Sequence, residues 1–121
     1  MQETGMSLGS FMDEFHDLTV VNPFNHRESV WNDSVVFEIA IFIHAIRLSN
    51  IHSLKPREGN GTLALIWLTA LADKHDVCIT GVAMPTQTKR MNKTELKAWY
   101  KRHGFAVTPS GDIRYTPAGR K

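Results

Sequence analysis

The sequence predicts a mixed α/β domain, and three observations carry that prediction. Two segments, 7–18 and 62–75, repeat apolar residues at helical spacing. A β-rich run extends from Val35 to Leu54, and a second strand-like run extends from Val77 to Ala83. A glycine-containing loop, 57–62, joins the first run to the second helix. The order strand, loop, helix, strand is typical of a crossover between parallel strands.

The first predicted element is a short amphipathic helix from Ser7 to Leu18. Its apolar positions are Leu8, Phe11, Met12, Phe15 and Leu18. The pair Asn22-Pro23 ends the helix or follows it closely. The segment 26–34 is polar and contains one tryptophan, Trp31; we expect that it could hold a second short helix.

Two adjacent strands are expected between residues 35 and 54. Phe37, Ile39, Ile41 and Ile43 alternate along the run and would share one face, with a reversal near His44-Ala45. The helix from Thr62 to His75 is apolar on most sides, which indicates burial against the sheet. Val77–Ala83 then predicts a core strand.

The third predicted helix follows a loop that contains Pro85. Asn92 and Glu95 have the spacing of a capping box. Downstream residues form one helical stripe and a stop: Leu96, Trp99, Tyr100, His103 and then Gly104. Segments 105–108 and 113–115 predict a closing hairpin around the turn 109–112.

Length and composition limit the number of domains, the binding partners and the cellular compartment that the sequence predicts. With 121 residues, the chain is expected to form one domain, 1–121, with loose ends at 1–6 and 117–121. A net charge of +2 permits nucleic-acid binding without indicating it. The single cysteine, Cys78, lies in an apolar run and predicts a core residue in a reducing compartment. No apolar run has the length of a membrane span, and the N-terminus lacks signal-peptide order, so a cytoplasmic location is expected.

The glycine loop suggests an anion site. Gly59 and Gly61 precede a helix whose first-turn amides lack intrahelical partners, and glycine lets a phosphate approach the backbone. The loop lacks the Lys-Ser or Lys-Thr of a Walker A sequence and the third glycine of a dinucleotide fingerprint. Gly-x-Gly is also common in an ordinary turn before a helix, so a structural role stays open.

Tyr100, Gly104 and Phe105 form a Tyr-x-x-x-Gly-Phe pattern downstream of Gly59-x-Gly61. This arrangement resembles the cofactor-binding core of the GNAT superfamily of acetyl-CoA-dependent N-acetyltransferases, and it looks especially like the small members carried by bacteriophages. The resemblance covers about residues 35–115. It implies a GNAT-like fold, with a mixed, mostly antiparallel sheet, splayed central strands and helices on both faces.

The resemblance also implies sites for acetyl-CoA as cosubstrate. The pantetheine arm would lie between strands 46–54 and 77–83, bonded to backbone near Ile51 and Ser53. The pyrophosphate would rest on the amides of the loop, with basic residues close by. These cofactor-binding positions are Arg57, Glu58, Gly59, Asn60, Gly61, Thr62 and Lys93, with Lys89 as an alternative to Lys93.

Tyr100 stands at the position of the family's general acid, which protonates the departing coenzyme A thiolate. An unperturbed phenol, with a pKa of about 10, stays protonated at neutral pH and suits this role. The base that deprotonates the acceptor amine is left open among His44, His52 and Glu38, with a water relay as a further route. The acceptor could be a small amine, a protein amine or an aminoacylated RNA, and the location would be the host cytoplasm for a phage-encoded chain.

The sequence differs from the GNAT pattern at three positions, and other functions are compatible with it. Pro56 occupies the place of a family Arg or Gln, Glu58 brings a negative charge beside the phosphates, and Lys93 replaces an asparagine. An alternative function is therefore a catalytically inactive GNAT-fold phage protein that binds and modulates a host protein. A third is a nucleic-acid binder using Lys101, Arg102 and Arg114.

Other aromatic residues also have structural interpretations. Tyr100 itself has the spacing of a core aromatic residue. Trp67 and Trp99 are expected to pack helices on the sheet, whereas Trp31 could line an acceptor pocket. The closing hairpin offers a sheet edge, so a homodimer is compatible with the sequence.

Overall fold

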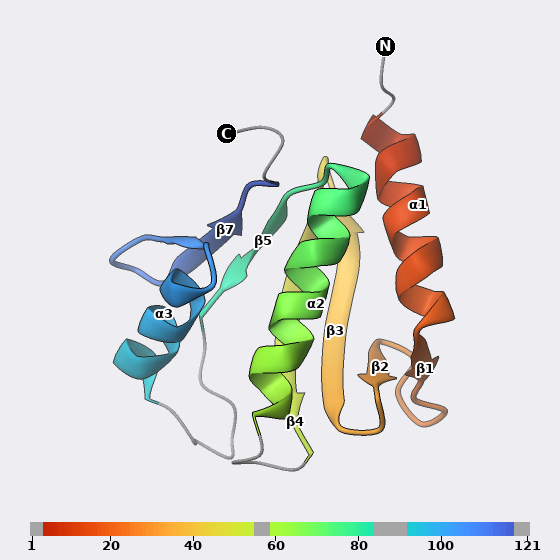
Figure 1. Ribbon diagram of the computed structural model, residues 1–121, viewed down its shortest axis with the longest axis horizontal. Coiled ribbons are helices and arrows are strands. Elements are labelled where there is room, and N and C mark those ends of the chain that lie inside the picture. The colour runs from red at the N-terminus through yellow and green to blue at the C-terminus, as the bar shows by residue number, and fades with distance from the viewer. Residues whose placement is uncertain (1–3, 55–58, 84–91, 118–121) are drawn as a thin grey trace.

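A seven-stranded sheet forms the centre of this structure, a computed structural model that describes residues 4–54, 59–83 and 92–117 (Figure 1). The strands run in the order β1-β2-β3-β4-β5-β7-β6. Among the described strands, only β4 and β5 pair in parallel, and the other neighbours are antiparallel. The strand bounds are β1 Thr19–Val21, β2 Glu28–Trp31, β3 Val35–Phe42, β4 Ala45–Ser53, β5 Ile79–Val82, β6 Ala106–Val107 and β7 Asp112–Tyr115. The predicted mixed α/β class with a mostly antiparallel sheet is confirmed.

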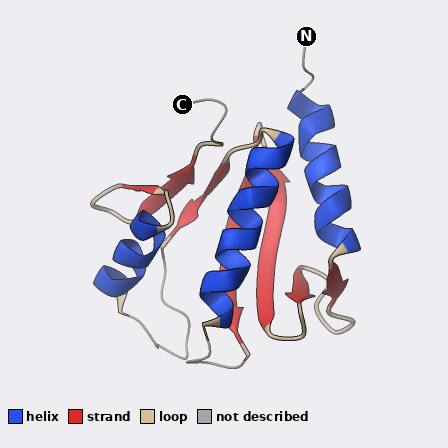
Figure 2. Ribbon diagram, in the orientation of Figure 1, coloured by secondary structure: helices blue, strands red, loops and turns tan. Residues whose placement is uncertain are grey.

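The described helices, α1 (Thr4–Asp17), α2 (Asn60–His75) and α3 (Lys93–Arg102), all pack on one face of the sheet (Figure 2). Phe15 of α1 and Trp67 of α2 both contact the Phe37 ring, at centroid distances of 5.8 and 5.9 Å. The expectation of helices on both faces is therefore wrong for this part of the chain. Its physical reason is the alternation along the central strands, which turns Arg47 and Arg114 away from the helices and leaves them exposed.

The N-terminal region has one helix and one hairpin. Helix α1 confirms the predicted 7–18 segment and buries Leu8, Phe11 and Phe15. It begins at Thr4, so the expectation of a loose end is wrong for residues 4–6. The second short helix expected within 26–34 is absent; β2 occupies that segment and pairs with β1 and β3. Trp31 stacks on Trp67 with ring centroids 5.6 Å apart, so it contributes to packing and does not line the cavity described below.

The hairpin of β3 and β4 confirms the two predicted strands and the reversal near His44. Phe42 pairs with Ala45, which leaves Ile43 and His44 as the turn. Ile43 has a φ of 59°, a left-handed conformation that is unfavourable for a β-branched residue. The register shifts between Glu38 and Ile39, so β4 carries a bulge at this level.

Helix α2 confirms the predicted 62–75 segment and begins two residues earlier. Its buried positions are Ala64, Leu65, Leu68, Leu71 and Ala72. Glu14 of α1 accepts from Lys74 at 2.8 Å and from His75 at 2.9 Å, and these hydrogen bonds lower the pKa of Glu14. The two helices are thus joined at the C-terminal end of α2.

Helix α3 has the predicted capping box. The Glu95 amide donates to Asn92 Oδ1 at 2.8 Å, and the Asn92 amide donates to Glu95 Oε1 at 2.9 Å. Gly104 follows the C-cap with a φ of 91°. The predicted closing hairpin is confirmed as β6 and β7, and Cys78 is buried as expected.

Candidate functional site

The central parallel strands stay together for only three residue pairs. Ile46, Arg47 and Leu48 of β4 pair with Ile79, Thr80 and Gly81 of β5. The bulge in β4 begins directly after Leu48, and a bulge bends its strand and increases the local twist. From that point the two strands diverge, which is visible below the middle of Figure 1. The expected splay between 46–54 and 77–83 thus has a local cause.

Gly81 holds the vertex where the strands part. A Cβ built at this position would lie 2.5 Å from the carbonyl oxygen of Leu48. No other residue type fits at this separation unless the backbone moves. Gly81 therefore keeps β5 close to β4 at the last residue pair before they diverge.

Beyond the vertex, Ile51 and Ser53 lie on the diverging part of β4. They pair with Phe37 and Val35 of β3, and both are half-buried. Within the described chain, β5 provides Ile51 with no ladder partner. An extended ligand arm could hydrogen-bond to backbone on this side, as the sequence predicts for Ile51 and Ser53.

Helix α2 begins near the diverging end of β4 and presents an open first turn. Gly59 is the N-cap, with a φ of 74°, and no side chain of the described residues caps the helix. In the described residues, the amides of Asn60, Gly61 and Thr62 have no hydrogen-bond acceptor. A Cβ at Gly61 would have no atom within 4 Å. Such a helix end can bind an anion.

The predicted cofactor contacts before and after α2 fall partly outside the described residues. Arg57 and Glu58 lie outside the described residues, as do Pro56 and Lys89. Lys93 is described and exposed, and its side chain lies over the β6–β7 turn, where a Cβ on Gly111 would be 2.9 Å from the Lys93 Cε. Its stem therefore supports that turn.

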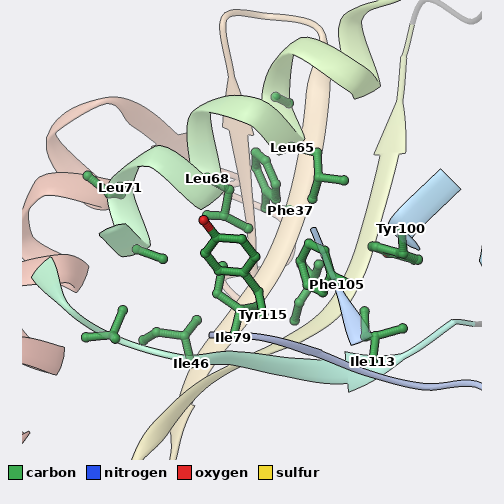
Figure 3. Close-up of a cluster of buried hydrophobic side chains, with 14 of the residues drawn as sticks. Phe37, Ile46, Leu65, Leu68, Leu71, Ile79, Tyr100, Phe105, Ile113 and Tyr115 are labelled. Atoms are coloured by element: carbon green, nitrogen blue, oxygen red, sulfur yellow. The ribbon is translucent and has the colours of Figure 1, made fainter. Parts of the chain in front are cut away.

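Tyr100 lies on α3 in the apolar layer between helix and sheet (Figure 3). Its ring packs against Phe105 and Trp99 at centroid distances of 5.2 and 5.1 Å, and the residue is only 4% exposed. Burial raises the pKa of the phenol. The hydroxyl thus stays protonated well above neutral pH, and the raised pKa makes it a weaker acid than an exposed phenol. Contact with a ligand sulfur would require access to this buried ring.

The candidate bases lie in three different places. His44 is in the β3–β4 turn, at the end of β4 remote from the start of α2. His52 is on β4, with its Nδ1 3.1 Å from Asn50 Nδ2. Glu38 lines a cavity beside β3. His52 is therefore the candidate on the diverging segment of β4.

The basic residues of the nucleic-acid interpretation are not brought together. Lys101 and Arg102 are exposed at the end of α3, on the helix-bearing side of the sheet. Arg114 lies on the opposite side, where its Nη2 is 3.5 Å from Cys78 Sγ. The three residues do not form one continuous patch.

The cavity beside β3 has a volume of about 540 Å³ and was not anticipated from the sequence. Met12, Phe15 and Ile39 give it an apolar wall, and His16, His26 and Arg27 give it polar groups. These residues come from α1, from the chain before β2 and from β3. Because these residues are far apart in the sequence, no sequence motif predicts the cavity. Its one possible signal is that β3 is longer than β2, which leaves part of the β3 edge without a partner strand among the described residues.

None of the described helices combines the length and apolar composition that a membrane crossing requires. No family model matches the sequence, and no curated protein matches it. A crystal structure of the anti-CRISPR protein AcrVA5 has a similar fold, with a TM-score of 0.62 and 14% sequence identity. The alignment covers 72% of this chain and 95% of that one, so the similarity extends over most of the sheet and helices as a likeness of fold.

Proposed function

We propose that this protein transfers an acetyl group from acetyl-CoA to an amine. The observation that carries the proposal is the early divergence of β4 from β5, followed directly by the uncapped start of α2. An extended cofactor arm would use backbone groups of β4 near Ile51, and its diphosphate would accept from the amides of 60–62. Open space at Gly61 supports this arrangement, because a phosphate could approach the helix without a steric barrier.

In the proposed reaction, the amine attacks the thioester carbonyl carbon in a ternary complex. The new C–N bond forms, the oxyanion collapses, the C–S bond breaks and the thiolate takes a proton. Tyr100 is the proposed donor, since a phenol is protonated at neutral pH and this one stands at the start of the Tyr-x-x-x-Gly-Phe pattern. His52 is the proposed acceptor of the amine proton, directly or through water. Backbone amides at the β4 bulge are the proposed donors to the oxyanion.

A second function is favoured by one observation, the burial of Tyr100 to 4% exposure. A phenol enclosed by Trp99 and Phe105 has a complete structural role in the core. In this alternative the chain keeps the fold without the reaction and binds a host protein as a modulator. The fold similarity to a protein described as an anti-CRISPR protein is compatible with it.

Calorimetric titration with acetyl-CoA, combined with an acetylation assay on a panel of amines, separates the two functions. The transferase predicts that wild type and Tyr100→Phe both bind acetyl-CoA and that turnover falls only in the variant, by about 100-fold or more. Tyr115→Phe is the matched control, because Tyr115 is also a buried core tyrosine and has no proposed chemical role. Absence of acetyl-CoA binding to wild type would leave the host-protein modulator as the function.

A further inference from the structure

The cavity beside β3 adjoins an incomplete strand edge. Strand β2 pairs with Val35–Glu38 and stops there, whereas β3 continues to Phe42. On that side, Ile39–Phe42 have no neighbouring strand within the described residues. In an antiparallel strand, the backbone N–H and C=O groups of successive residues point alternately to one side and to the other. Alternate residues of 39–42 therefore present these groups at the open edge, where another strand can pair with them. Ile39, Ala40 and Ile41 all line the cavity.

The walls of the cavity combine an apolar surface with hydrogen-bond donors and one carboxylate, that of Glu38. Phe15 is fully buried beneath it, and Met12 and Ile39 are half-buried. Arg27 and two histidines, His16 and His26, are exposed at its rim. The guanidinium of Arg27 is permanently charged and matches a carboxylate in geometry.

We propose that this cavity binds an extended peptide segment of a partner protein that carries an acidic side chain. The segment would pair with Ile39–Phe42 on the edge of β3 that β2 leaves uncovered. Its backbone would complete the ladder, one apolar side chain would contact Met12 and Phe15, and its carboxylate would meet Arg27. The peptide contacts named here use the edge of β3 and none of the residues proposed to bind acetyl-CoA, although the cavity lining also includes the candidate base Glu38 and Ser49 at the β4 bulge.

Three features favour a peptide over a compact small molecule. The free edge of Ile39–Phe42 offers backbone donors and acceptors in a line, which matches an extended chain. The cavity volume of about 540 Å³ admits a few side chains. The pairing of β2 ends at Glu38, so a strand beside Ile39–Phe42 would not overlap the ladder between β2 and β3.

Selection from a displayed library of random short peptides tests the proposed acidic side chain and the alternation of apolar residues in the bound peptide. The wild-type protein should enrich peptides with alternating apolar residues and an Asp or Glu. Arg27→Glu should exchange that preference for Lys or Arg. Arg102→Glu, the same substitution at an exposed position on α3, should retain the wild-type preference. Absence of enrichment, or enrichment that Arg27→Glu leaves unchanged, would overturn the proposal.

A synthetic copy of one selected peptide tests the strand addition. Two forms are made, each methylated on a different alternating set of backbone amides. The form methylated on the amides that face β3 should bind about tenfold more weakly, and the other should bind like the parent. Equal binding of the two forms would exclude pairing along the edge. Sedimentation of the protein alone provides a second check. If the wild type forms dimers and Arg27→Glu abolishes them, the edge of β3 binds a second copy of this chain, and the proposal of a partner peptide is overturned.

Discussion

The indole Nε1 of Trp99 donates a hydrogen bond to Thr62 Oγ1 at 3.0 Å. This bond joins α3 to the first turn of α2, two elements that are 37 residues apart at these positions. It also gives the Thr62 side chain a partner within the protein. The bond uses only the hydroxyl of Thr62, so it leaves the backbone amide that we propose as a phosphate donor unaffected, and it links this turn to the helix that carries Tyr100.

Replacing Thr62 by valine tests this bond. The variant keeps the side-chain shape and the backbone amide but leaves the largely buried indole N–H without its acceptor. We expect a loss of about 1 to 2 kcal/mol in the free energy of unfolding, measured by urea denaturation. The affinity for acetyl-CoA should change little, because the amide is retained. A large loss of affinity without a loss of stability would contradict this division of roles.

Gly81→Ala tests the vertex between β4 and β5. The added methyl group would meet the Leu48 carbonyl, so the strands must separate. A destabilisation of about 1 to 3 kcal/mol is expected in chemical denaturation. Gly9→Ala is the matched control, since a Cβ there meets no atom within 4 Å and Gly9 lies inside α1. That control should gain stability, by about 1 kcal/mol, from helix propensity; equal effects at both sites would refute the steric argument.

Gly61→Ala separates stability from the proposed ligand. Alanine in the first turn of α2 should leave the fold intact or stabilise it by about 0.5 kcal/mol. If a diphosphate approaches this backbone, the methyl group should weaken acetyl-CoA binding by about tenfold in calorimetry. Unchanged binding in a stable variant would remove Gly61 from the site.

Tyr115→Phe tests the bond between β7 and the end of α2. Tyr115 Oη donates to Asp73 Oδ1 at 2.7 Å, and the tyrosine is buried. Removal of the hydroxyl should cost about 1.5 kcal/mol in the free energy of unfolding, because the acceptor is a carboxylate. Denaturation in urea at neutral pH measures this difference.

The same residue predicts a pH dependence. Burial, with the neighbouring Asp73 carboxylate, raises the pKa of Tyr115 to about 12, above the unfolded value of about 10. The folded state therefore holds this proton more tightly, and the stabilisation is complete below pH 10 and lost as the pH rises toward 12. Wild type should lose stability more steeply than Tyr115→Phe between those values. Parallel curves for the two proteins would contradict the assignment.

Periodicity predicted the long elements well. The apolar spacing of Phe11 and Phe15, the alternation around Phe37 and the Asn92–Glu95 pair each specify local structure through neighbours in sequence. The short strands β1 and β2 lack this information. Their three and four residues are stabilised mainly by pairing with each other and with β3, which local patterns cannot show.

The arrangement of the helices and of the candidate sites was harder to predict. The expectation of helices on both faces was wrong because the outer face of the sheet is defined only by pairing across β5, which places Arg47 and Arg114 on the same side. The bulge after Leu48 is a shift of one residue, which leaves no sequence pattern. The β3 cavity collects Met12, Arg27 and Ile39 from distant segments, so it appears only after folding.

Ile43, in the turn between β3 and β4, is a position at which the protein could be stabilised by substitution. A branched side chain in a left-handed turn stores roughly 1 kcal/mol or more of conformational energy, and its exposed fraction of 72% shows that packing recovers little of it. The residue belongs neither to the opening between β4 and β5 nor to the lining of the β3 cavity. Glycine or asparagine at position 43 would therefore provide a sturdier parent protein, in which costly substitutions such as Gly81→Ala can be studied while the chain stays folded.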